Sequence, residues 1–212
     1  MRLVFQALVS LFASTAFGAP LELRLVGVDG GGIAGTVVIL RSVDPTRPAA
    51  RPVETQIDQI DRQFVPHVLV VPAGSKILFP NSDSVRHQVY SFSPAKRFSL
   101  PLYRGKPYPP VEFDRNGVVT LGCNIHDQMR AYVFVVEAQY YGRTDSAGTF
   151  KAQDVQPGAY TVQIWHPLAR DTRPLIEQQI TVGAADTHLT LRIAAPLRLR
   201  PESQVPANWD AY

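Results

Sequence analysis

Three side chains that can bind a metal lie close together near the middle of the 212-residue chain. Cys123, His126 and Met129 form a C-x-x-H-x-x-M pattern; Cys123 is the only cysteine, and Met129 is the only methionine after Met1. A thiolate and a thioether are soft ligands and an imidazole is borderline, so this set selects copper over calcium or magnesium. A plane of two imidazoles and one thiolate needs a second histidine. His87 is the candidate, because it starts a predicted strand that pairing can bring beside this loop.

The start of the chain predicts export. Residues 1–18 read MRLVFQALVSLFASTAFG, with one arginine, an apolar run and small residues before a predicted cleavage after Gly18. The run is shorter than the ~20 apolar residues that span a bilayer, so we expect a periplasmic protein with no membrane insertion after signal cleavage. An exported lone thiol cannot form an intramolecular disulfide and is prone to oxidation, which favours a bound metal at Cys123.

Composition favours an all-β fold. The chain has 18 prolines and 14 glycines without a period, and interior prolines break helices. Short apolar runs separated by turn residues are typical of β-sandwiches. We predict a hairpin over 21–41, strands at 64–71, 76–79 and 88–92, and a long connection over 93–110. The formal net charge is only +3 and no lysine or arginine run occurs, which argues against nucleic-acid binding.

A resemblance to cupredoxins covers residues 54–137. It rests on FVPHVLVVPAGSKILFPNSDSVRHQVYS, then GVVTLGCNIHDQM and VFVV, and the C-x-x-H-x-x-M spacing is similar to that of amicyanin. The resemblance implies a Greek-key β-sandwich with one type 1 copper, held equatorially by His87, Cys123 and His126 and axially by Met129. The whole chain also resembles exported proteins labelled methylamine-utilisation or plastocyanin-like proteins.

The sequence departs from the cupredoxin pattern around the predicted ligands. Gln88 stands where cupredoxins usually carry Asn after the first ligand His, and the ligand loop has Asn124, Ile125, Asp127 and Gln128 in place of prolines and an apolar rim. The usual apolar docking patch is therefore not predicted from this loop. Two polar residues precede His87 and either hydrogen-bond the ligands or only shape a turn, namely Asn81 and Asp83.

The remaining segments resemble a carboxypeptidase-regulatory-type domain, a small Ig-like or transthyretin-like β-sandwich. The resemblance rests on LRLVGVD, GTVVIL, RTDSAGTF and QPGAYTV. Neither fragment alone has enough strands to bury a core. We therefore predict a discontinuous domain of 21–51 with 138–196, a cupredoxin domain at 52–137 inserted in it, and a tail at 197–212. This type of domain contributes no catalytic residue.

The predicted function is transport of single electrons between periplasmic redox partners such as a cytochrome or a dehydrogenase. The four ligands leave no open position for a substrate, which argues against an enzyme. The alternatives are copper storage or delivery, an adaptor without redox traffic, and a thiol enzyme using Cys123 with His126 or His87. The cations of 93–110 are either a solvated surface or a surface that steers an acidic partner.

Several other motifs predict ordinary structure. Gly30–Gly35 satisfies G-x-G-x-x-G, but the β-branched run TVVIL follows instead of a helix, so a turn is expected rather than a phosphate loop. His67 alternates with apolar residues and is expected to pack or to lie at the surface. His166 and His188 are expected to be surface residues.

Overall fold

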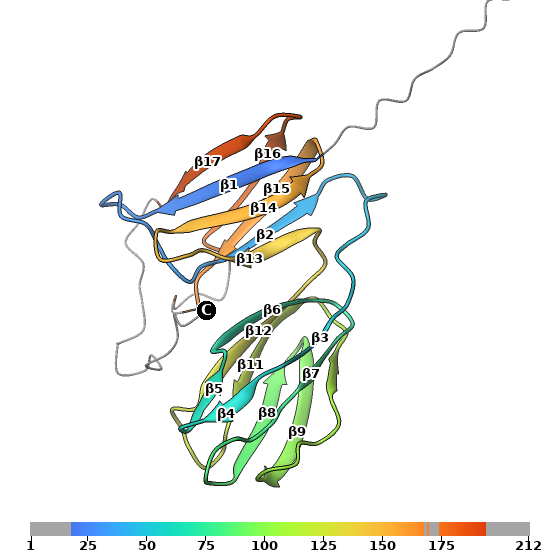
Figure 1. The fold of residues 1–212 in the computed structure, drawn as a ribbon, viewed down its shortest axis with the longest axis vertical. Helices are drawn as coiled ribbons and strands as arrows, with labels where there is room; N and C mark the ends of the chain where they lie inside the picture. The colour runs from blue at the N-terminus through green and yellow to red at the C-terminus, as the bar shows by residue number, and fades with distance from the viewer. Residues whose placement is uncertain (1–17, 168, 170–173, 194–212) are drawn as a thin grey trace, which may run out of the picture.

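The computed structural model describes residues 18–167, 169 and 174–193. The predicted tail at 197–212 and the predicted signal peptide, apart from Gly18, lie outside these residues. All the regular structure described is β, in 17 strands, which confirms the all-β prediction. Within the same residues, no helix has the length and apolar character needed to cross a bilayer. Figure 1 shows the strands gathered in two lobes, one above the other.

The lower lobe contains the strands from the middle of the chain. Its main sheet has the order β6-β12-β11-β8-β9, and a second sheet with the order β10-β7-β3 and the ribbon β4–β5 complete it. Their bounds are β3 Glu54–Gln56, β4 Asp58–Ile60, β5 Gln63–Val65, β6 Val68–Pro72, β7 Ser75–Leu78, β8 His87–Ser93, β9 Lys96–Tyr103, β10 Val111–Phe113, β11 Gly117–Gly122 and β12 Arg130–Val136. One apolar core, which includes Phe79, Phe113 and Leu121, fills the lobe.

The upper lobe joins strands from both ends of the described chain. Its two sheets have the orders β14-β1-β17 and β13-β2-β15-β16 and enclose a second core that includes Leu23, Leu40 and Tyr160. The bounds are β1 Ala19–Val26, β2 Val37–Ser42, β13 Tyr140–Arg143, β14 Thr149–Val155, β15 Gly158–Trp165, β16 Ile176–Val182 and β17 Thr187–Arg192.

The predicted hairpin over 21–41 is wrong. β1 pairs with β14 and β17, whereas β2 pairs with β13 and β15, so the two strands belong to different sheets. Both edges of β1 are already paired, and the glycine-rich connection carries the chain from one sheet to the other. A strand does follow the G-x-G-x-x-G motif, as predicted, so the motif lacks the helix that a phosphate loop requires.

The predicted long connection over 93–110 is also wrong in its first half. β9 occupies Lys96–Tyr103 and pairs with β8 in an antiparallel hairpin. Pro101 lies inside this strand, and a proline lacks the N–H group that sheet pairing uses. The proline fits here because β9 is the edge strand of the sheet, with a partner on one side only.

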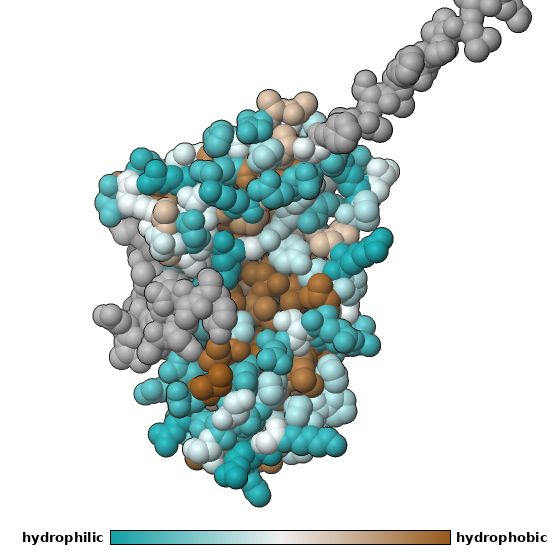
Figure 2. Space-filling model, in the orientation of Figure 1, coloured by the Kyte–Doolittle hydropathy of each residue, from teal (hydrophilic) through white to brown (hydrophobic). Residues whose placement is uncertain are grey.

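A third apolar cluster joins the lobes through β12. Every residue of β12 after Arg130 is buried. One face of the strand enters the lower core through Ala131, Val133 and Val135. The other face belongs to the cluster between the lobes through Tyr132, Phe134 and Val136. The Trp165 ring from β15 packs against Phe134, with ring centroids 4.1 Å apart. Figure 2 shows apolar surface at the same level, where the lobes meet. The upper lobe thus covers part of the outer face of the main sheet.

Two histidines outside the predicted ligand set, His67 and His166, are packed inside the protein. His67 is 2% exposed and its ring stands edge-on to Tyr132, which confirms a packed residue. The surface prediction for His166 is wrong, because it is 3% exposed at the end of β15. Burial, together with the nearby charge of Arg143, lowers its pKa to about 4.

Burial of His166 predicts a loss of stability in mild acid. Its folded pKa lies below the ordinary value of 6.5, so the unfolded chain binds the proton first as pH falls. The free energy of unfolding should therefore drop between pH 6.5 and 4, by on the order of 2 kcal/mol. Urea unfolding at pH 7.0, 5.5 and 4.5 should show a smaller drop for His166→Gln. His188→Gln, at an exposed position, should behave like the unaltered protein, and an equal drop in all three would contradict the prediction.

Candidate metal centre

Three of the four predicted ligands lie together at one end of the lower lobe. His87 begins β8 and is fully buried, Cys123 follows the end of β11, and His126 lies in the turn between β11 and β12. The Nδ1 atoms of the two histidines are 3.1 Å apart, and the Cys123 Sγ atom lies 3.9 Å from each of them. Strand pairing thus brings residue 87 to a loop 36 positions further along the chain.

This triangle has the dimensions of a metal site. Its circumcentre lies about 2.1 Å from each atom, close to the bond lengths known for zinc, roughly 2.0–2.1 Å to imidazole and roughly 2.3 Å to thiolate. These three residues could therefore hold an ion with little movement of the protein. The donor set of one thiol and two imidazoles suits copper.

The turn that follows Cys123 is closed by the fourth predicted ligand. The backbone N–H of Met129 donates to the carbonyl oxygen of His126 at 2.9 Å. Met129 is 2% exposed and belongs to the same apolar core as Cys123. The core therefore anchors both ends of the loop that carries His126. The role of Met129 as an axial ligand stays a prediction.

A carboxylate orients the buried imidazole. The Oδ2 atom of Asp83 lies 2.9 Å from Nε2 of His87. The hydrogen bond from His87, with those from the N–H groups of Arg62 and Ser84, holds the pKa of the Asp83 carboxyl well below its ordinary value. An ionised Asp83 accepts a proton-bearing Nε2, which leaves the Nδ1 lone pair of His87 directed toward Cys123 and His126. Asp83 is thus the residue, of the two candidates before His87, that reaches a predicted ligand.

The second candidate shapes the turn that presents Asp83. Asn81 donates through Nδ2 to the carbonyl oxygens of Tyr103 and Val85, and its Oδ1 accepts the N–H of Asp83 at 3.0 Å. On the other side, the backbone N–H of Arg62 donates to Asp83 Oδ2 at 2.7 Å. Asn81 is 5% exposed, so this turn is part of the packed structure.

Arg62 also helps to hold Asp83 in place, a role that the sequence did not reveal. It lies in the two-residue turn between β4 and β5, where Asp61 and Arg62 have φ values of 50° and 59°. This left-handed conformation is typical of hairpin turns with Asn-Gly or Asp-Gly, and Asp-Arg is a weak signal for it. The turn directs a backbone N–H at Asp83.

The second histidine lies at the edge of the site. His126 is half-buried, and burial is the main cause that lowers the pKa of its imidazole, with contributions from His87 and Arg62. A neutral imidazole keeps a lone pair for a metal. Ile125, beside it in the loop, is 53% exposed. The site is therefore enclosed at His87 and Cys123 and open to the surface at His126.

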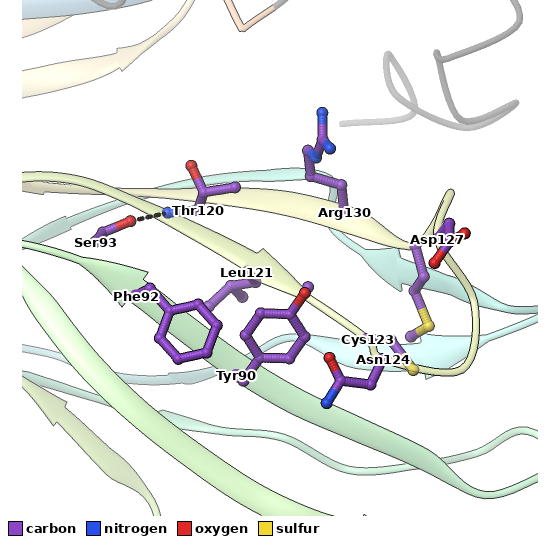
Figure 3. A pocket seen from close by; sticks show the side chains of 11 residues that line it. Tyr90, Phe92, Ser93, Thr120, Leu121, Cys123, Asn124, Asp127 and Arg130 are labelled. Atoms are coloured by element: carbon purple, nitrogen blue, oxygen red, sulfur yellow. Dashed lines mark hydrogen bonds between the residues drawn. The ribbon is translucent and has the colours of Figure 1, made fainter.

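A groove of about 590 Å³ lies on the sulfur side of the site. Its lining includes Cys123, Met129 and Arg130, and in Figure 3 the rings of Tyr90 and Phe92 stand side by side along it, with Cys123 and Asn124 at one end. The Tyr90 ring lies over the backbone of Gly122, the residue before Cys123. A Cβ atom at Gly122 would lie 2.8 Å from Cζ of Tyr90.

This close approach predicts that Gly122→Ala destabilises the fold. The added methyl group must displace the outer end of the Tyr90 ring, which lines the groove, so the cost should be about 1 kcal/mol, the lower end of the range for overpacking. Chemical unfolding should show that loss, and the double variant Gly122→Ala with Tyr90→Ala should lose less than the two single variants together. Additive losses would show that the ring and the glycine do not constrain each other.

The cations of 93–110 do not share one loop, because Lys96 and Arg97 begin β9 and Arg104 follows its end. Lys96 pairs with Asp114 at 3.1 Å, and Arg97 is the cross-strand partner of Phe92. Arg104 lies at the other end of β9, where its Nη1 donates to the carbonyl oxygen of Ser84. Gln88 contacts Ser99 Oγ at 3.0 Å, so it links β8 to β9.

Comparisons with known proteins find similarity to parts of the chain. A family model described as polysaccharide lyase family 4, domain II, matches residues 115–190, which run from β11 to β17. No curated protein matches the sequence.

Three similar solved structures are described as a cupredoxin, a Cu-containing nitrite reductase and an amicyanin variant. A purple cupredoxin from Nitrosopumilus maritimus is 24% identical, with 39% of this chain and 99% of that chain covered and a TM-score of 0.35. The Cu-containing nitrite reductase from Thermus scotoductus is 22% identical, covers 53% of this chain and 28% of its own, and has a TM-score of 0.38. A Cu(I) amicyanin variant is 19% identical, with coverages of 39% and 82% and a TM-score of 0.36. The resemblances to methylamine-utilisation proteins and to carboxypeptidase-regulatory domains stay predictions. Cupredoxins are among the solved structures to which this chain is similar.

Proposed function

We propose that this protein is a periplasmic type 1 copper protein that carries single electrons between redox partners. His87, Cys123 and His126 are its equatorial ligands, and Met129 is its axial ligand. The observation that carries the proposal is the triangle of two Nδ1 atoms and one Sγ atom, with sides of 3.1, 3.9 and 3.9 Å. A set of one thiolate, two imidazoles and a thioether is typical of copper electron-transfer sites.

The residues around the site support a carrier that changes little between oxidation states. When bound, copper supplies the one-electron chemistry. Asp83 fixes the His87 ring and keeps the proton on Nε2, while strand β8 and the β11–β12 loop hold the donor atoms in place. Cys123 is 3% exposed and His87 is fully buried, so water is largely excluded from the donor atoms. Rigid, dry ligands reduce the rearrangement that accompanies electron transfer.

The same features support a role other than catalysis. Four protein ligands would leave no position for a substrate, whereas catalytic metal sites keep one open. A thiol enzyme would need an accessible sulfur with one imidazole as its base. Cys123 is buried, and its sulfur lies at the same distance from both imidazoles.

Copper storage or delivery is the second candidate function. It is supported by the half-buried position of His126 beside the exposed Ile125, because a ligand at the surface can be released to an acceptor protein. In that case the site would hold Cu(I) and exchange it.

Loading the protein with Cu(II) tests the two functions. An electron carrier should show an intense visible absorption from thiolate-to-copper charge transfer and a reversible one-electron couple. It should also keep its copper against a chelator. A colourless, air-stable Cu(I) form that yields its metal readily to a chelator would favour delivery. Failure to bind copper in either oxidation state would overturn both.

We also propose that the chain folds as two domains, with 52–137 inserted into a discontinuous domain of 21–51 and 138–196. The strand pairing supports this division, because the strands from Glu54 to Val136 pair with one another and β1, β2 and β13–β17 pair among themselves. Limited proteolysis should cut the exposed segment near residue 51 and leave 21–51 bound to the segment after 138. Release of 21–51 from a still-folded remainder would contradict the proposal.

A further inference from the structure

We propose that the outer face around Tyr90 and Phe92 is a second electron-transfer surface, reached from Cys123 and separate from the His126 edge. Its partner would be a redox protein whose contact face is apolar at the centre and acidic at the rim. The inference rests on the proposed function, because it concerns a surface of the same copper site.

The register of the main sheet builds this face. Cross-strand partners point to the same side of a sheet, and Ser99, Tyr90, Gly122 and Arg130 form one row across β9, β8, β11 and β12. Gly122 has no side chain, so the Tyr90 ring occupies the space above its backbone. Gly122 is joined by one peptide bond to Cys123. The Tyr90 ring is thus packed against the backbone immediately before the predicted thiolate ligand.

A second ring continues from Tyr90 to the surface. The Tyr90 and Phe92 ring centroids are 5.1 Å apart, and Phe92 is 75% exposed, the highest value among the exposed large apolar side chains of the described residues. Gly122, Tyr90 and Phe92 therefore form a contiguous path from the sulfur ligand to solvent. Exposed aromatic side chains next to arginines are typical of protein interfaces.

The charges beside the rings indicate the chemistry of the partner. Arg97 is the cross-strand partner of Phe92, Arg130 ends the row through Tyr90, and both are exposed. Asp127 is the acidic residue among those that line the groove. Two cations against one carboxylate favour a partner that brings carboxylates to the rim.

The position of the upper lobe makes this face distinct from the rest of the sheet. Tyr132 and Phe134 belong to the outer face too, but they pack against Trp165 of the upper lobe. The cluster between the lobes ends before Tyr90 and Phe92, which do not belong to it. The exposed aromatic pair therefore lies on β8, outside the part of the face that the upper lobe covers, with Tyr90 against Gly122.

The transfer at this face involves one electron and no bond or proton. In the copper-loaded protein, the bound Cu(I) would be oxidised to Cu(II), and an oxidised acceptor docked on the face would take up that electron. The reverse step uses a reduced donor on the same face.

The docking surface can be mapped without any redox reaction. We suggest adding hexacyanochromate(III), a paramagnetic anion, to the full chain loaded with Zn(II) and recording amide line broadening by NMR. Broadening should centre on Phe92, Ser93 and Arg130. Broadening confined to the surroundings of His126 and Arg104 would overturn the assignment of this face.

Kinetics with charge-matched variants test the transfer itself. Oxidation of the Cu(I) protein by ferricyanide should slow about 3–10-fold in Arg97→Glu and in Arg130→Glu, because an anionic oxidant loses its attraction to the face. Arg24→Glu in β1, at an exposed site in the upper lobe, carries the same change in net charge and should react within about 1.5-fold of the unaltered protein. Tyr90→Leu should slow oxidation while the visible absorption and the reduction potential stay unchanged.

Failure of this inference can be told from failure of the proposed function. Absence of copper binding or of the visible absorption in the unaltered protein would overturn the proposed function. A normal absorption with equal rates for Arg97→Glu, Arg130→Glu and Arg24→Glu, or an unchanged rate for Tyr90→Leu, would overturn the second surface alone.

Discussion

Replacing Cys123 by serine should abolish both the intense visible absorption of the copper-loaded protein and its reversible one-electron couple. The absorption needs charge transfer from a soft thiolate, and a serine hydroxyl stays protonated and is a hard, weak ligand. In the proposed site the remaining donors, two Nδ1 atoms 3.1 Å apart and the Met129 thioether, would still hold copper, but with lower affinity. Copper titration followed by visible spectroscopy and voltammetry measures both losses.

The fold should survive this substitution, which makes the spectroscopic loss interpretable. Serine is close in size to cysteine, and Cys123 forms no disulfide. Chemical unfolding of the metal-free variant should therefore stay near that of the unaltered protein. His67→Gln provides a control for a buried imidazole outside the triangle, and its copper spectrum should be unchanged. An intense absorption retained by Cys123→Ser would mean that the thiolate is not the ligand.

The local half of the candidate site could be predicted from sequence because its spacing is short. Cys123, His126 and Met129 fall in one turn, and the hydrogen bond from Met129 to His126 closes that turn. His87 was predicted from a chemical requirement, a second imidazole, together with its place at the start of a predicted strand. In β8 the side chains of His87, Val89 and Ser91 are buried while those between them are more exposed, as a two-residue period predicts.

Pairing between distant strands could not be predicted in the same way. β1 and β2 look like a hairpin because they are neighbours in sequence with a glycine-rich link between them. Leu23, however, pairs with Phe150 on one side and Leu189 on the other, more than a hundred residues away. Alternation fixes which side chains point inward, but any strand with the same alternation can satisfy it.

The sequence of a strand that is buried on both faces does not show which part of the protein covers each face. β12 reads RAYVFVV with almost no polar residue, because one face enters the lower core and the other meets the upper lobe. The sequence therefore shows that this strand is central without showing what covers it. In the same way, the sequence around Asp83 does not show whether this residue only shapes a turn or also hydrogen-bonds to His87. The structure resolves the question, since the Asp83 carboxylate accepts hydrogen bonds from both the turn and the imidazole.

Asp83→Asn should weaken copper binding by about 10–100-fold, the range found when a carboxylate that supports a metal-binding histidine is removed. An ionised carboxylate accepts from Nε2 of His87 and favours the lone pair on Nδ1, and a neutral amide does this less well. Competition with a chelator of known affinity measures the change. Asp127→Asn removes the same charge one residue from His126, so it controls for electrostatics alone and should change affinity by less than about 3-fold.

Stability measurements separate the orientation of His87 from a general loosening of the turn. Asp83 also accepts the N–H groups of Arg62 and Ser84, so Asp83→Asn should lower the free energy of unfolding of the metal-free protein as well. Ser82 lies in the same turn as Asp83, and its hydroxyl donates to Asp58 in β4. Ser82→Ala removes that hydroxyl and leaves the hydrogen bond between Asp83 and His87 in place. If both variants lose stability and only Asp83→Asn loses copper affinity, then the carboxylate acts through the imidazole. Equal losses of affinity in the two variants would instead assign the effect to the turn, and His87 would not need its acidic partner.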